Sequence, residues 1–435
     1  MTPKTFRIKS FGCQMNVYDG ERMAELLAAE GMAAAIDGSD ADLVVLNTCH
    51  IREKAAEKAY SDVGRLRRED GSKPLIALAG CVAQAEGGEA MRRSPMIDLV
   101  VGPQAYHRLP AMVREAMRGA RPVDTDMPAI SKFDDFPTRR RANPSAFLTV
   151  QEGCDKFCTY CVVPYTRGAE ISRPFGDIVA EAHALVDAGA KEIVLLGQNV
   201  NAWSDGRRGL AELIRKLAAI DGLHRIRYTT SHPADMTDAL IKAHGEVDKL
   251  MPYLHLPVQS GSNRILKAMN RSHTAETYLA IIEKIRAARP DIALSGDFIV
   301  GFPGETDGDF EATLRIVDAV GYSGAYSFKY SARPGTPAAA MEDQIPRELM
   351  DERLQRLQKR INAHQLAFNR LKLGLDTQIL IERHGKHPGQ MIGKSPWLQS
   401  VHVETDARPG EIVDVTLVAA GPNSVTGALR RKAAA

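Results

Sequence analysis

Short apolar runs alternate with helical segments over most of this chain, and that alternation constrains the fold more than any other feature. In the first 120 residues the runs are Phe6–Ser10, Leu43–Asn47, Leu75–Ala79 and Ile97–Val101. Between the first two runs, Met23, Leu26 and Leu27 have the spacing of one helix face. Strands that alternate with helices favour a parallel sheet covered by helices. The sequence therefore predicts an open parallel α/β domain over residues 1–120.

Six further apolar runs follow a proline-rich linker at residues 121–145. They are Phe147–Gln151, Glu192–Gly197, Arg225–Thr230, Tyr253–Val258, Ala293–Gly301 and Ala325–Tyr330. Six strand and helix pairs predict an open (β/α) barrel over residues 146–371, ending in a charged helical stretch. Three short strand-like runs then predict a small all-β barrel over residues 372–435. These runs are Thr377–Ile381, Val401–Glu404 and Ile412–Val418. The predicted fold class is α/β with a C-terminal all-β barrel.

Composition excludes several classes of protein. With 435 residues, 44% of them hydrophobic, the chain can bury more than one core. Lys and Arg total 56 against 54 Asp and Glu, so a nucleic-acid surface would have to be local. No apolar run approaches the roughly 18 residues that cross a bilayer, and the N-terminus lacks a secretory pattern. We expect a cytoplasmic protein without membrane contact.

Three of the six cysteines lie in the segment GCDKFCTYC, directly after the first predicted barrel strand. They are Cys154, Cys158 and Cys161. Zinc normally takes four protein ligands, and no fourth Cys or His has a suitable local spacing, whereas a cubane iron–sulfur cluster can bind three thiolates and keep one iron open. The spacing predicts a [4Fe–4S] cluster with an open iron. Three buried or zinc-binding cysteines are the alternative.

The other three cysteines, Cys13, Cys49 and Cys81, each follow an apolar run of the first domain. The carboxyl ends of parallel strands share one edge of a sheet, where ligands bind. These thiols are therefore expected to converge on a second three-thiolate site. Three ordinary small core residues are the alternative.

Six segments carry a resemblance to the radical S-adenosylmethionine methylthiotransferases, and the resemblance covers nearly all of the chain. They are SFGCQMNVYDGER (10–22), NTCHIREKA (47–55), AGCVAQAEG (79–87), EGCDKFCTYCVVPYTRGAEISRP (152–174), HLPVQSGS (255–262) and DFIVGFPGET (297–306). Two departures are visible. Ala169 stands where the family has an acid, and His273 stands where an aromatic residue is usual. Neither position is a cluster ligand in the family.

The resemblance implies two [4Fe–4S] clusters and S-adenosylmethionine as cofactors. It assigns Cys154, Cys158 and Cys161 to the radical cluster, which binds and cleaves S-adenosylmethionine. It assigns Cys13, Cys49 and Cys81 to a second cluster, which holds the sulfur that is methylated and inserted. No catalytic side chain is expected beyond the clusters.

Contacts to S-adenosylmethionine are expected where the barrel strands end, because cofactors bind at the carboxyl ends of such strands. The candidates are Tyr160, Gly197, Gln198, Asn199, Ser231, Gln259, Asp297 and Gly301. Glycine, serine and asparagine at strand ends are also common turn formers, which is the alternative.

The function expected from the resemblance is radical methylthiolation of C2 of N6-(dimethylallyl)adenosine at position 37 of tRNAs, using two S-adenosylmethionine molecules and a cluster-bound sulfur. The C-terminal barrel resembles a TRAM domain, an OB-like RNA-binding module. Candidate RNA contacts are Arg139, Arg140, Arg141, Trp397, Arg430, Arg431 and Lys432.

The expected partners are tRNA with an isopentenylated adenosine in its anticodon stem-loop, an electron donor such as flavodoxin or ferredoxin, and a sulfur or cluster donor. Three other functions are alternatives: methylthiolation of a ribosomal-protein aspartate, methylthiolation of threonylcarbamoyladenosine in tRNA, and a non-catalytic iron–sulfur RNA-binding sensor. The segments CQMN and VVPYTRG point away from the first two.

Overall fold

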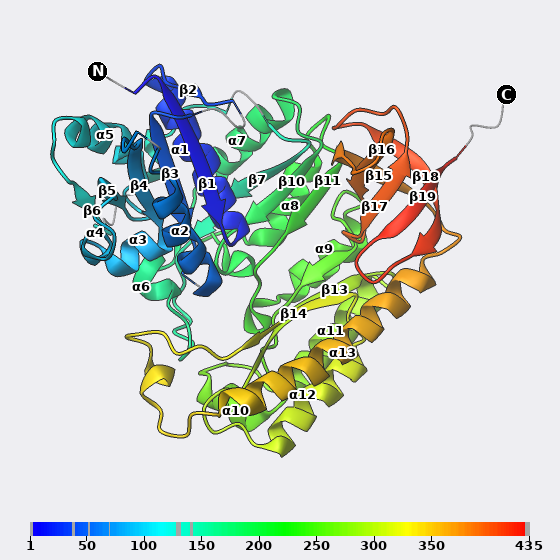
Figure 1. Ribbon diagram of the computed structural model, residues 1–435. Helices are drawn as coiled ribbons and strands as arrows, with labels where there is room; N and C mark the ends of the chain where they lie inside the picture. The colour runs from blue at the N-terminus through cyan, green and yellow to red at the C-terminus, as the bar shows by residue number, and fades with distance from the viewer. Residues whose placement is uncertain are drawn as a thin grey trace. The chain divides into compact units, whose positions relative to one another are not determined.

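The computed structural model describes residues 3–36, 40–50, 53–68, 70–127, 132–139 and 142–430. The chain divides into two compact units (Figure 1). The first comprises residues 1–139, 152–155 and 162–171, and the second comprises residues 140–151, 156–161 and 172–435. Two short pieces of the segment that carries the CxxxCxxC loop therefore pack with the first unit.

A six-stranded sheet forms the middle of the first unit, with the order β2-β1-β3-β4-β5-β6 and all pairs parallel. The strands are β1 (Thr5–Phe11), β2 (Ala33–Ala34), β3 (Leu43–Thr48), β4 (Leu75–Gly80), β5 (Leu99–Val101) and β6 (Val123–Asp124). The helices are α1 (Gln14–Ala29), α2 (Glu53–Arg65), α3 (Cys81–Glu86), α4 (Glu89–Arg93), α5 (Leu109–Met117) and α6 (Val163–Arg167), with 3-10 turns η1 (Tyr106–Arg108) and η2 (Lys132–Asp135).

Both faces of this sheet are covered. Leu43 and Val45 pack in one hydrophobic cluster with residues of α1 and α5, whereas Val44 and Leu46 pack in another with residues of α2, α3 and α4. Because successive side chains of a strand point to opposite faces, a strand covered on both sides must be apolar throughout. That requirement explains the continuous apolar runs and confirms the open parallel α/β domain.

Six parallel strands also form the larger part of the second unit, as two three-stranded sheets with the orders β11-β10-β7 and β12-β13-β14. The strands are β7 (Ser145–Thr149), β10 (Glu192–Leu196), β11 (Arg225–Tyr228), β12 (Tyr253–His255), β13 (Ala293–Val300) and β14 (Gly324–Lys329). Two further short strands are β8 (Gln151–Glu152) and β9 (Ile171–Ser172). All six predicted barrel runs are strands, and one continuous hydrophobic core lies between them and the helices.

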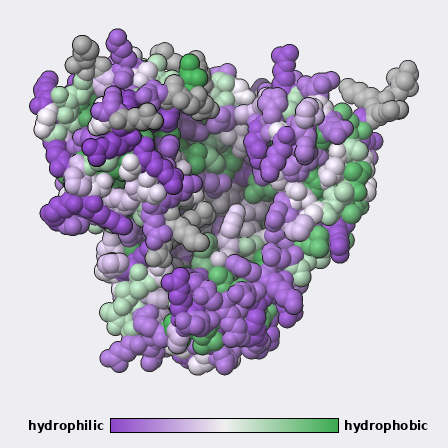
Figure 2. All heavy atoms as spheres, viewed as in Figure 1, coloured by the Kyte–Doolittle hydropathy of each residue, from purple (hydrophilic) through white to green (hydrophobic). Residues whose placement is uncertain are grey.

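The helices of this unit are α7 (Phe175–Asp187), α8 (Leu210–Ala218), α9 (Asp238–Glu246), α10 (Asn263–Ala268), α11 (Ala275–Ala288), α12 (Asp307–Val320) and α13 (Arg347–Leu371), with 3-10 turns η3 (Val200–Ala202), η4 (Pro233–Asp235) and η5 (Pro337–Ala340). The long helix α13 buries Arg353, Leu357 and Ile361, which are spaced by four residues on one stripe. Its other faces are charged, and the surface over α12 and α13 is mostly hydrophilic in Figure 2. Among the described residues, no helix is long and apolar enough to span a membrane.

A closed five-stranded barrel follows, with the order β15-β16-β17-β19-β18. Its strands are β15 (Asp376–His384), β16 (Gln390–Lys394), β17 (Ser400–Glu404), β18 (Ile412–Ala420) and β19 (Val425–Leu429). The small all-β barrel is thus confirmed, but β16 and β19 were not predicted. Both contain a glycine at a close approach: a Cβ on Gly393 would lie 2.4 Å from the Leu380 carbonyl oxygen. A Cβ on Gly427 would lie 3.1 Å from Val401.

Two buried arginines of β11 hold the C-terminal barrel within the second unit. Arg225 donates to the backbone carbonyls of Lys394 (2.7 Å) and Gln378 (2.8 Å). Arg227 donates to the carbonyls of Pro396 (2.8 Å) and Ser395 (2.9 Å). Arg227 also pairs with Glu192 of β10, at 2.8 Å between Nε and Oε2. Each guanidinium therefore joins two elements that are far apart in the sequence.

Part of the linker is folded into the first unit. It contains β6, and it buries Lys132 and Arg139 in the first unit. Arg139 lies 2.9 Å from a carboxylate oxygen of Glu21 and 2.9 Å from one of Glu25. The expectation that Arg139 contacts RNA phosphate was therefore wrong, because its charge is already neutralised inside the fold. Arg140 and Arg141 lie outside the described residues.

Replacement of Arg227 by Met is expected to lower the free energy of unfolding by about 3–5 kcal/mol. It leaves the buried Glu192 carboxylate without its cation and frees two carbonyls. Equilibrium denaturation by urea measures the loss. The control is Arg356→Met, which removes a pair with Glu311 whose side chains are nearly half exposed, and which should cost no more than about 1 kcal/mol. Equal losses for the two variants would contradict a structural role for the buried pair.

Candidate functional site

Cys13, Cys49 and Cys81 follow the ends of three adjacent strands. Cys49 comes directly after β3, Cys81 is the first residue of α3 after β4, and Cys13 lies two residues beyond the end of β1. The strand ends are in register, since Phe11 is aligned with Thr48 and Thr48 with Gly80. Neighbouring strands lie about 4.8 Å apart, so the three thiols share one edge of the sheet.

Glycine and two asparagines shape the chain around these thiols. Gly12 has φ +115°, and a Cβ there would lie 2.2 Å from the Cβ of Cys49. The Cys13 Sγ lies 3.0 Å from Oδ1 of Asn16, which belongs to the first turn of α1. Asn16 and Asn47 are buried and hydrogen-bond to each other, at 3.0 Å from Nδ2 of Asn16 to Oδ1 of Asn47. Only glycine at position 12 lets the turn pass so close to Cys49.

The electrostatics differ from one thiol to the next. A hydrogen bond with Cys49 lowers the pKa of Cys13 to about 6, although burial acts in the opposite direction. Burial raises the pKa of Cys81, and the nearby Arg167 guanidinium opposes that rise through its charge and a hydrogen bond. A thiol must lose its proton to bind a metal, so a neighbouring cation favours ligation.

A buried charged network lies next to this edge. Arg167 donates from Nη2 to Asp19 (2.6 Å) and from Nη1 to Glu152 (2.6 Å). Lys132 donates to the same Glu152 oxygen (2.8 Å), and the Tyr106 hydroxyl donates to Asp19 (3.0 Å). The four charged side chains are each at most 2% exposed. The sequence analysis missed all five residues. Asp19, Glu152 and Arg167 lie inside quoted segments, but nothing in the sequence indicated their burial.

The second half of the CxxxCxxC loop packs in the second unit. Cys158 is buried, and its Sγ lies 3.6 Å from Nη1 of Arg271. Arg271 also donates to the Pro257 carbonyl at 2.8 Å. The loop is fixed by the backbone nitrogen of Thr159, which donates to the Met269 carbonyl at 3.1 Å. Cys154 belongs to the first unit, where its backbone nitrogen donates to the Gly168 carbonyl at 3.3 Å.

Both sets of donors are thiols, the usual protein ligands of iron–sulfur clusters. Within the described part of the chain, no three His, Cys, Asp or Glu side chains lie close enough to hold one metal ion. A cubane binds each thiolate to a different iron, so its ligands stand farther apart than those of one ion. Each set consists of three thiols, which fits a cluster with one open iron.

The candidate S-adenosylmethionine residues after β10 and β11 lie side by side. Gln151 accepts from the backbone nitrogens of Gln198 (2.9 Å) and Asn199 (3.0 Å). A Cβ on Gly197 would lie 2.5 Å from the same Gln151 oxygen, so the turn needs glycine. Within the described residues, Asn199 Oδ1 and Ser231 Oγ are buried without a hydrogen-bond partner. Two polar atoms are therefore available to a ligand here. Gln151, which fixes the turn, was not singled out in the sequence.

The other four candidates lie on or near β12 to β14 and the cluster loop. Gln259 has φ +75°, and its backbone nitrogen donates to the Asp297 carbonyl at 2.9 Å. The Asp297 carboxylate lies 3.6 Å from Nε2 of His255. Gly301 has φ +71°, and a Cβ there would lie 2.1 Å from Cγ of Met350, so the position requires glycine. Tyr160 packs beside a hydrophobic cluster of the same unit, and burial raises the pKa of its hydroxyl.

Several aromatic residues near these candidates were not predicted as site residues. His273 is buried, and its ring lies 5.8 Å from that of His232. Burial lowers the pKa of His273 to about 4 and keeps this imidazole neutral near pH 7. On β14, Tyr326 and Phe328 are aligned with Asp297 and Ile299 and share their face of the sheet, opposite the helices. Their side chains are 54% and 36% exposed.

The departure at Ala169 falls on an exposed side chain. Its backbone carbonyl oxygen lies 1.9 Å from where a Cβ on Gly153 would be, so position 153 requires glycine. Ile51 and Arg52 of the NTCHIREKA segment lie outside the described residues.

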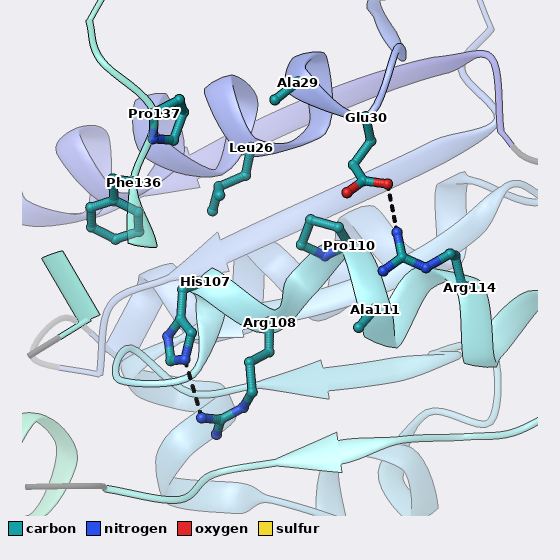
Figure 3. Close-up of a pocket in the computed structure, with 10 residues that line it drawn as sticks. All are labelled: Leu26, Ala29, Glu30, His107, Arg108, Pro110, Ala111, Arg114, Phe136 and Pro137. Atoms are coloured by element: carbon teal, nitrogen blue, oxygen red, sulfur yellow. Dashed lines mark hydrogen bonds and ion pairs between the residues drawn. The ribbon is translucent and has the colours of Figure 1, made fainter. Parts of the chain in front are cut away.

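A cavity of about 550 Å³ lies elsewhere in the first unit, between α1 and α5 (Figure 3). Leu26, Ala29 and Glu30 line it from the C-terminal end of α1, and Glu30 pairs with Arg114 of α5. Cys13 caps the other end of this helix, about 20 Å away at 1.5 Å per residue. The cavity is therefore separate from the thiol site.

Two family models match the chain. Residues 148–317 match the Radical SAM superfamily, and residues 5–102 match a family described as Uncharacterized protein family UPF0004. The first match contains the CxxxCxxC loop, and the second contains Cys13, Cys49 and Cys81.

Curated relatives match nearly the whole chain. The tRNA-2-methylthio-N(6)-dimethylallyladenosine synthase of Novosphingobium aromaticivorans is 70% identical over 98% of this chain and 98% of that protein. The chain belongs to the tRNA-2-methylthio-N(6)-dimethylallyladenosine synthase family. Synthases of the same name from Sphingopyxis alaskensis and Zymomonas mobilis subsp. mobilis are 68% and 67% identical over 98% of this chain, and the matches cover 97% and 96% of those proteins.

Solved structures of low identity show the fold of this synthase family member. The radical S-adenosylmethionine methyltransferase TsrM from Kitasatospora setae has a TM-score of 0.57 at 13% identity and covers 77% of each chain. The radical enzyme OxsB has a TM-score of 0.53 at 14% identity over 83% of this chain and 56% of that chain. Both matches agree with the predicted fold class.

Membership of the synthase family confirms the resemblance and the enzyme class. The protein is a radical S-adenosylmethionine enzyme whose cofactors include S-adenosylmethionine and a [4Fe–4S] cluster. The second cluster and the individual ligand residues stay predictions.

Replacement of Gly12 by Ala is expected to destabilise the first unit more than replacement of Gly31 by Ala. Both glycines have positive φ, but a Cβ on Gly31 meets nothing within 4 Å. Gly31→Ala therefore reports backbone strain alone, about 1–2 kcal/mol, whereas Gly12→Ala adds a collision with Cys49. Urea unfolding of the two apo-proteins compares them. If Gly12→Ala lowered the free energy of unfolding no more than Gly31→Ala, the turn at Gly12 would pack less tightly against Cys49 than the structure indicates.

Proposed function

We propose that this protein methylthiolates C2 of N6-(dimethylallyl)adenosine at position 37 of tRNAs, giving the 2-methylthio derivative. The observation that carries the proposal is the 62–70% identity, over 97% or more of the chain, to synthases named for this reaction. Two S-adenosylmethionine molecules and a cluster-bound sulfur would be consumed. The two sets of three thiols lie in segments matched by two different family models. This supports one cluster for radical formation and another for sulfur donation.

In the radical half, Cys154, Cys158 and Cys161 would hold the cluster. A reduced cluster held there would supply the one electron that cleaves S-adenosylmethionine into methionine and a 5′-deoxyadenosyl radical. Gln151 holds the turn at Gly197–Asn199, and Asn199 Oδ1 and Ser231 Oγ would bind the polar groups of S-adenosylmethionine. Arg271 places a cation beside Cys158. Tyr160, Gln259, Asp297 and Gly301 are kept as proposed neighbours of this ligand.

In the sulfur-donating half, Cys13, Cys49 and Cys81 would hold the second [4Fe–4S] cluster. A cluster held there would carry the sulfur that is methylated and transferred. The thiol-only donor set, the shared sheet edge and the tight turn at Gly12 support the assignment.

The C-terminal barrel and β14 are the proposed RNA-binding parts. Lys372 lies 4.0 Å over the Trp397 ring, and Asp291 accepts its indole N–H at 3.2 Å, so this tryptophan serves internal packing more than RNA stacking. Arg430 pairs with Asp376 at 3.2 Å. Arg431 and Lys432 lie outside the described residues.

A better candidate surface is the exposed hairpin of β15 and β16, with Arg383, His384, Lys386 and His387. Tyr326 and Phe328 would contact the base.

An electron donor such as flavodoxin or ferredoxin, a sulfur or cluster donor, and a cytoplasmic location complete the proposal. The two donors follow from the chemistry, because each turnover consumes electrons and sulfur that the chain does not itself supply. The location is proposed because the proposed substrate is tRNA.

The deciding experiment is mass spectrometry of nucleosides from isopentenylated tRNA. The tRNA is incubated anaerobically with the reconstituted protein, S-adenosylmethionine and a reductant, and 2-methylthio-N6-(dimethylallyl)adenosine is expected. The same tRNA without the isopentenyl group is the control. If 5′-deoxyadenosine formed without the modified nucleoside, the substrate would be another one, such as a ribosomal-protein aspartate or threonylcarbamoyladenosine. If neither product formed in protein that holds both clusters, a non-catalytic iron–sulfur RNA-binding protein would replace the proposal.

Single cysteine variants separate the two clusters. Cys158→Ala should abolish 5′-deoxyadenosine formation, because it removes a ligand of the radical cluster. Cys49→Ala should stop methylthiolation while leaving much of the reductive cleavage. Iron analysis shows whether each variant has lost only one cluster, about four irons per chain. Equal loss of both activities in a folded Cys49→Ala variant would contradict the division of labour.

A further inference from the structure

The turn that follows β10 is tied to the turn that follows β11. The backbone nitrogen of Val200 donates to the Thr230 carbonyl at 2.9 Å. Asn201 bridges the same turns, because its Nδ2 donates to the His232 carbonyl and its Oδ1 accepts from the His232 nitrogen, both at 2.8 Å. Asn199 stands in the first of these turns and is 1% exposed. Its side-chain amide therefore lies in a rigid frame.

One side of the Asn199 amide is bound to a carboxylate. Its Nδ2 donates to Oδ2 of Asp235, the last residue of η4, at 2.8 Å. An ionised carboxylate only accepts hydrogen bonds, so the amide nitrogen has to face Asp235 and the amide oxygen has to face away from it. Among the residues that the structure describes, this oxygen is buried without a hydrogen-bond partner. A buried acceptor left unpaired is costly, so we expect a donor from a ligand there.

Lys156 fixes the carboxylate that fixes the amide. Its Nζ lies 2.8 Å from each carboxylate oxygen of Asp235. The main chain of Lys156 is held as well, because the Asn270 side chain donates to the carbonyls of Lys156 (3.3 Å) and Phe157 (2.9 Å). All of these residues belong to the second unit. Lys156, Asp235 and Asn199 thus form one chain of bonds between three segments that are distant in the sequence.

We propose that Asp235, held by Lys156, is a positioning residue that orients the Asn199 amide so that Oδ1 accepts a hydrogen bond from S-adenosylmethionine. The inference rests on the proposed function, which makes Asn199 a contact of this ligand. The group at Oδ1 is a hydrogen-bond donor, which excludes the ligand's carboxylate. The α-ammonium group and the donors of the adenosine part, its ribose hydroxyls and adenine amino group, have the required chemistry.

The test exchanges the two bonded side chains. In Asn199→Asp, a second carboxylate meets Asp235, and the like charges repel and disturb the acceptor. In the double variant Asn199→Asp with Asp235→Asn, the amide at position 235 donates to the carboxylate at position 199, and an oxygen again faces the ligand. A residue that only supported the fold would not be rescued by this exchange, so the double variant separates positioning from packing.

Binding of S-adenosylhomocysteine, which is not cleaved, is measured by isothermal titration calorimetry on the anaerobically reconstituted protein. Asn199→Asp should raise the dissociation constant about tenfold or more, the effect of losing one charge-assisted hydrogen bond. The double variant should return it to within about threefold of the value for the unmodified protein. Asp235→Ala should raise it about threefold or more, because the amide then turns freely.

The same titrations with 5′-deoxyadenosine identify the donor, because this molecule lacks the amino-acid part. If Asn199→Asp weakens the binding of both molecules, Oδ1 accepts from the adenosine part. If it weakens only S-adenosylhomocysteine, Oδ1 accepts from the α-ammonium group. Either result supports the positioning role.

The matched control is Asp238→Asn. Asp238 lies three positions from Asp235 and also pairs with a lysine, Lys284, at 2.9 Å, but the two side chains are 84% and 61% exposed. Its replacement should leave the dissociation constants unchanged. Iron analysis of every variant shows whether the loop that carries Lys156 still holds its cluster, so that a loss of iron is not mistaken for a loss of orientation.

Asn199→Ala separates the inference from the contact on which it rests. If this variant binds S-adenosylhomocysteine as tightly as the unmodified protein, Asn199 is not a ligand contact, and that part of the proposed function is wrong. If it binds more weakly but Asp235→Ala has no effect, the role of Asp235 is wrong and the contact stands. A double variant no better than Asn199→Asp would also overturn the role. If Asn199→Asp does not fold, Asp235→Ala decides by itself.

Discussion

The first unit depends on the alignment of the ends of β1, β3 and β4. Because Phe11, Thr48 and Gly80 lie in register, the chain leaves all three strands at one level, and a cysteine follows each strand within two residues. β3 and β4 are buried on both faces, so polar chemistry on these strands is confined to their ends. A shift of one strand by one residue would turn its side chains to the other face and displace its thiol from the group.

Buried arginines fix the positions of segments that are not held by strand pairing. Arg167 ties α6 to α1 and Glu152 within the first unit, Arg271 supports the loop at Cys158, and Arg227 joins β11 to the C-terminal barrel. A buried guanidinium is tolerated only when carboxylates and carbonyls satisfy its donors. Each of these residues therefore dictates the relative position of two segments that are distant in the sequence, and two of the three do so beside a cysteine.

Apolar runs predicted the strands well because a strand covered by helices on both sides has to be apolar. The same reasoning failed in the C-terminal barrel, where β16 and β19 contain glycines that let neighbouring strands approach. It also failed in the linker, where composition indicated a spacer and the structure buries Lys132 and Arg139. Single buried charges leave no periodic pattern, so sequence analysis had no signal for them.

The sequence by itself determined the order of strands and helices, the spacing of the cysteines and, through long motifs, the family. These are properties of local pattern and of covalent neighbours. Tertiary structure decided which charged groups act together: Asp19, Lys132, Glu152 and Arg167 come from four separate segments and form one buried network beside Cys13 and Cys81. Their association depends on burial, which makes an unpaired charge too costly to keep. Burial is a property of the packed chain, and it cannot be read from any one segment.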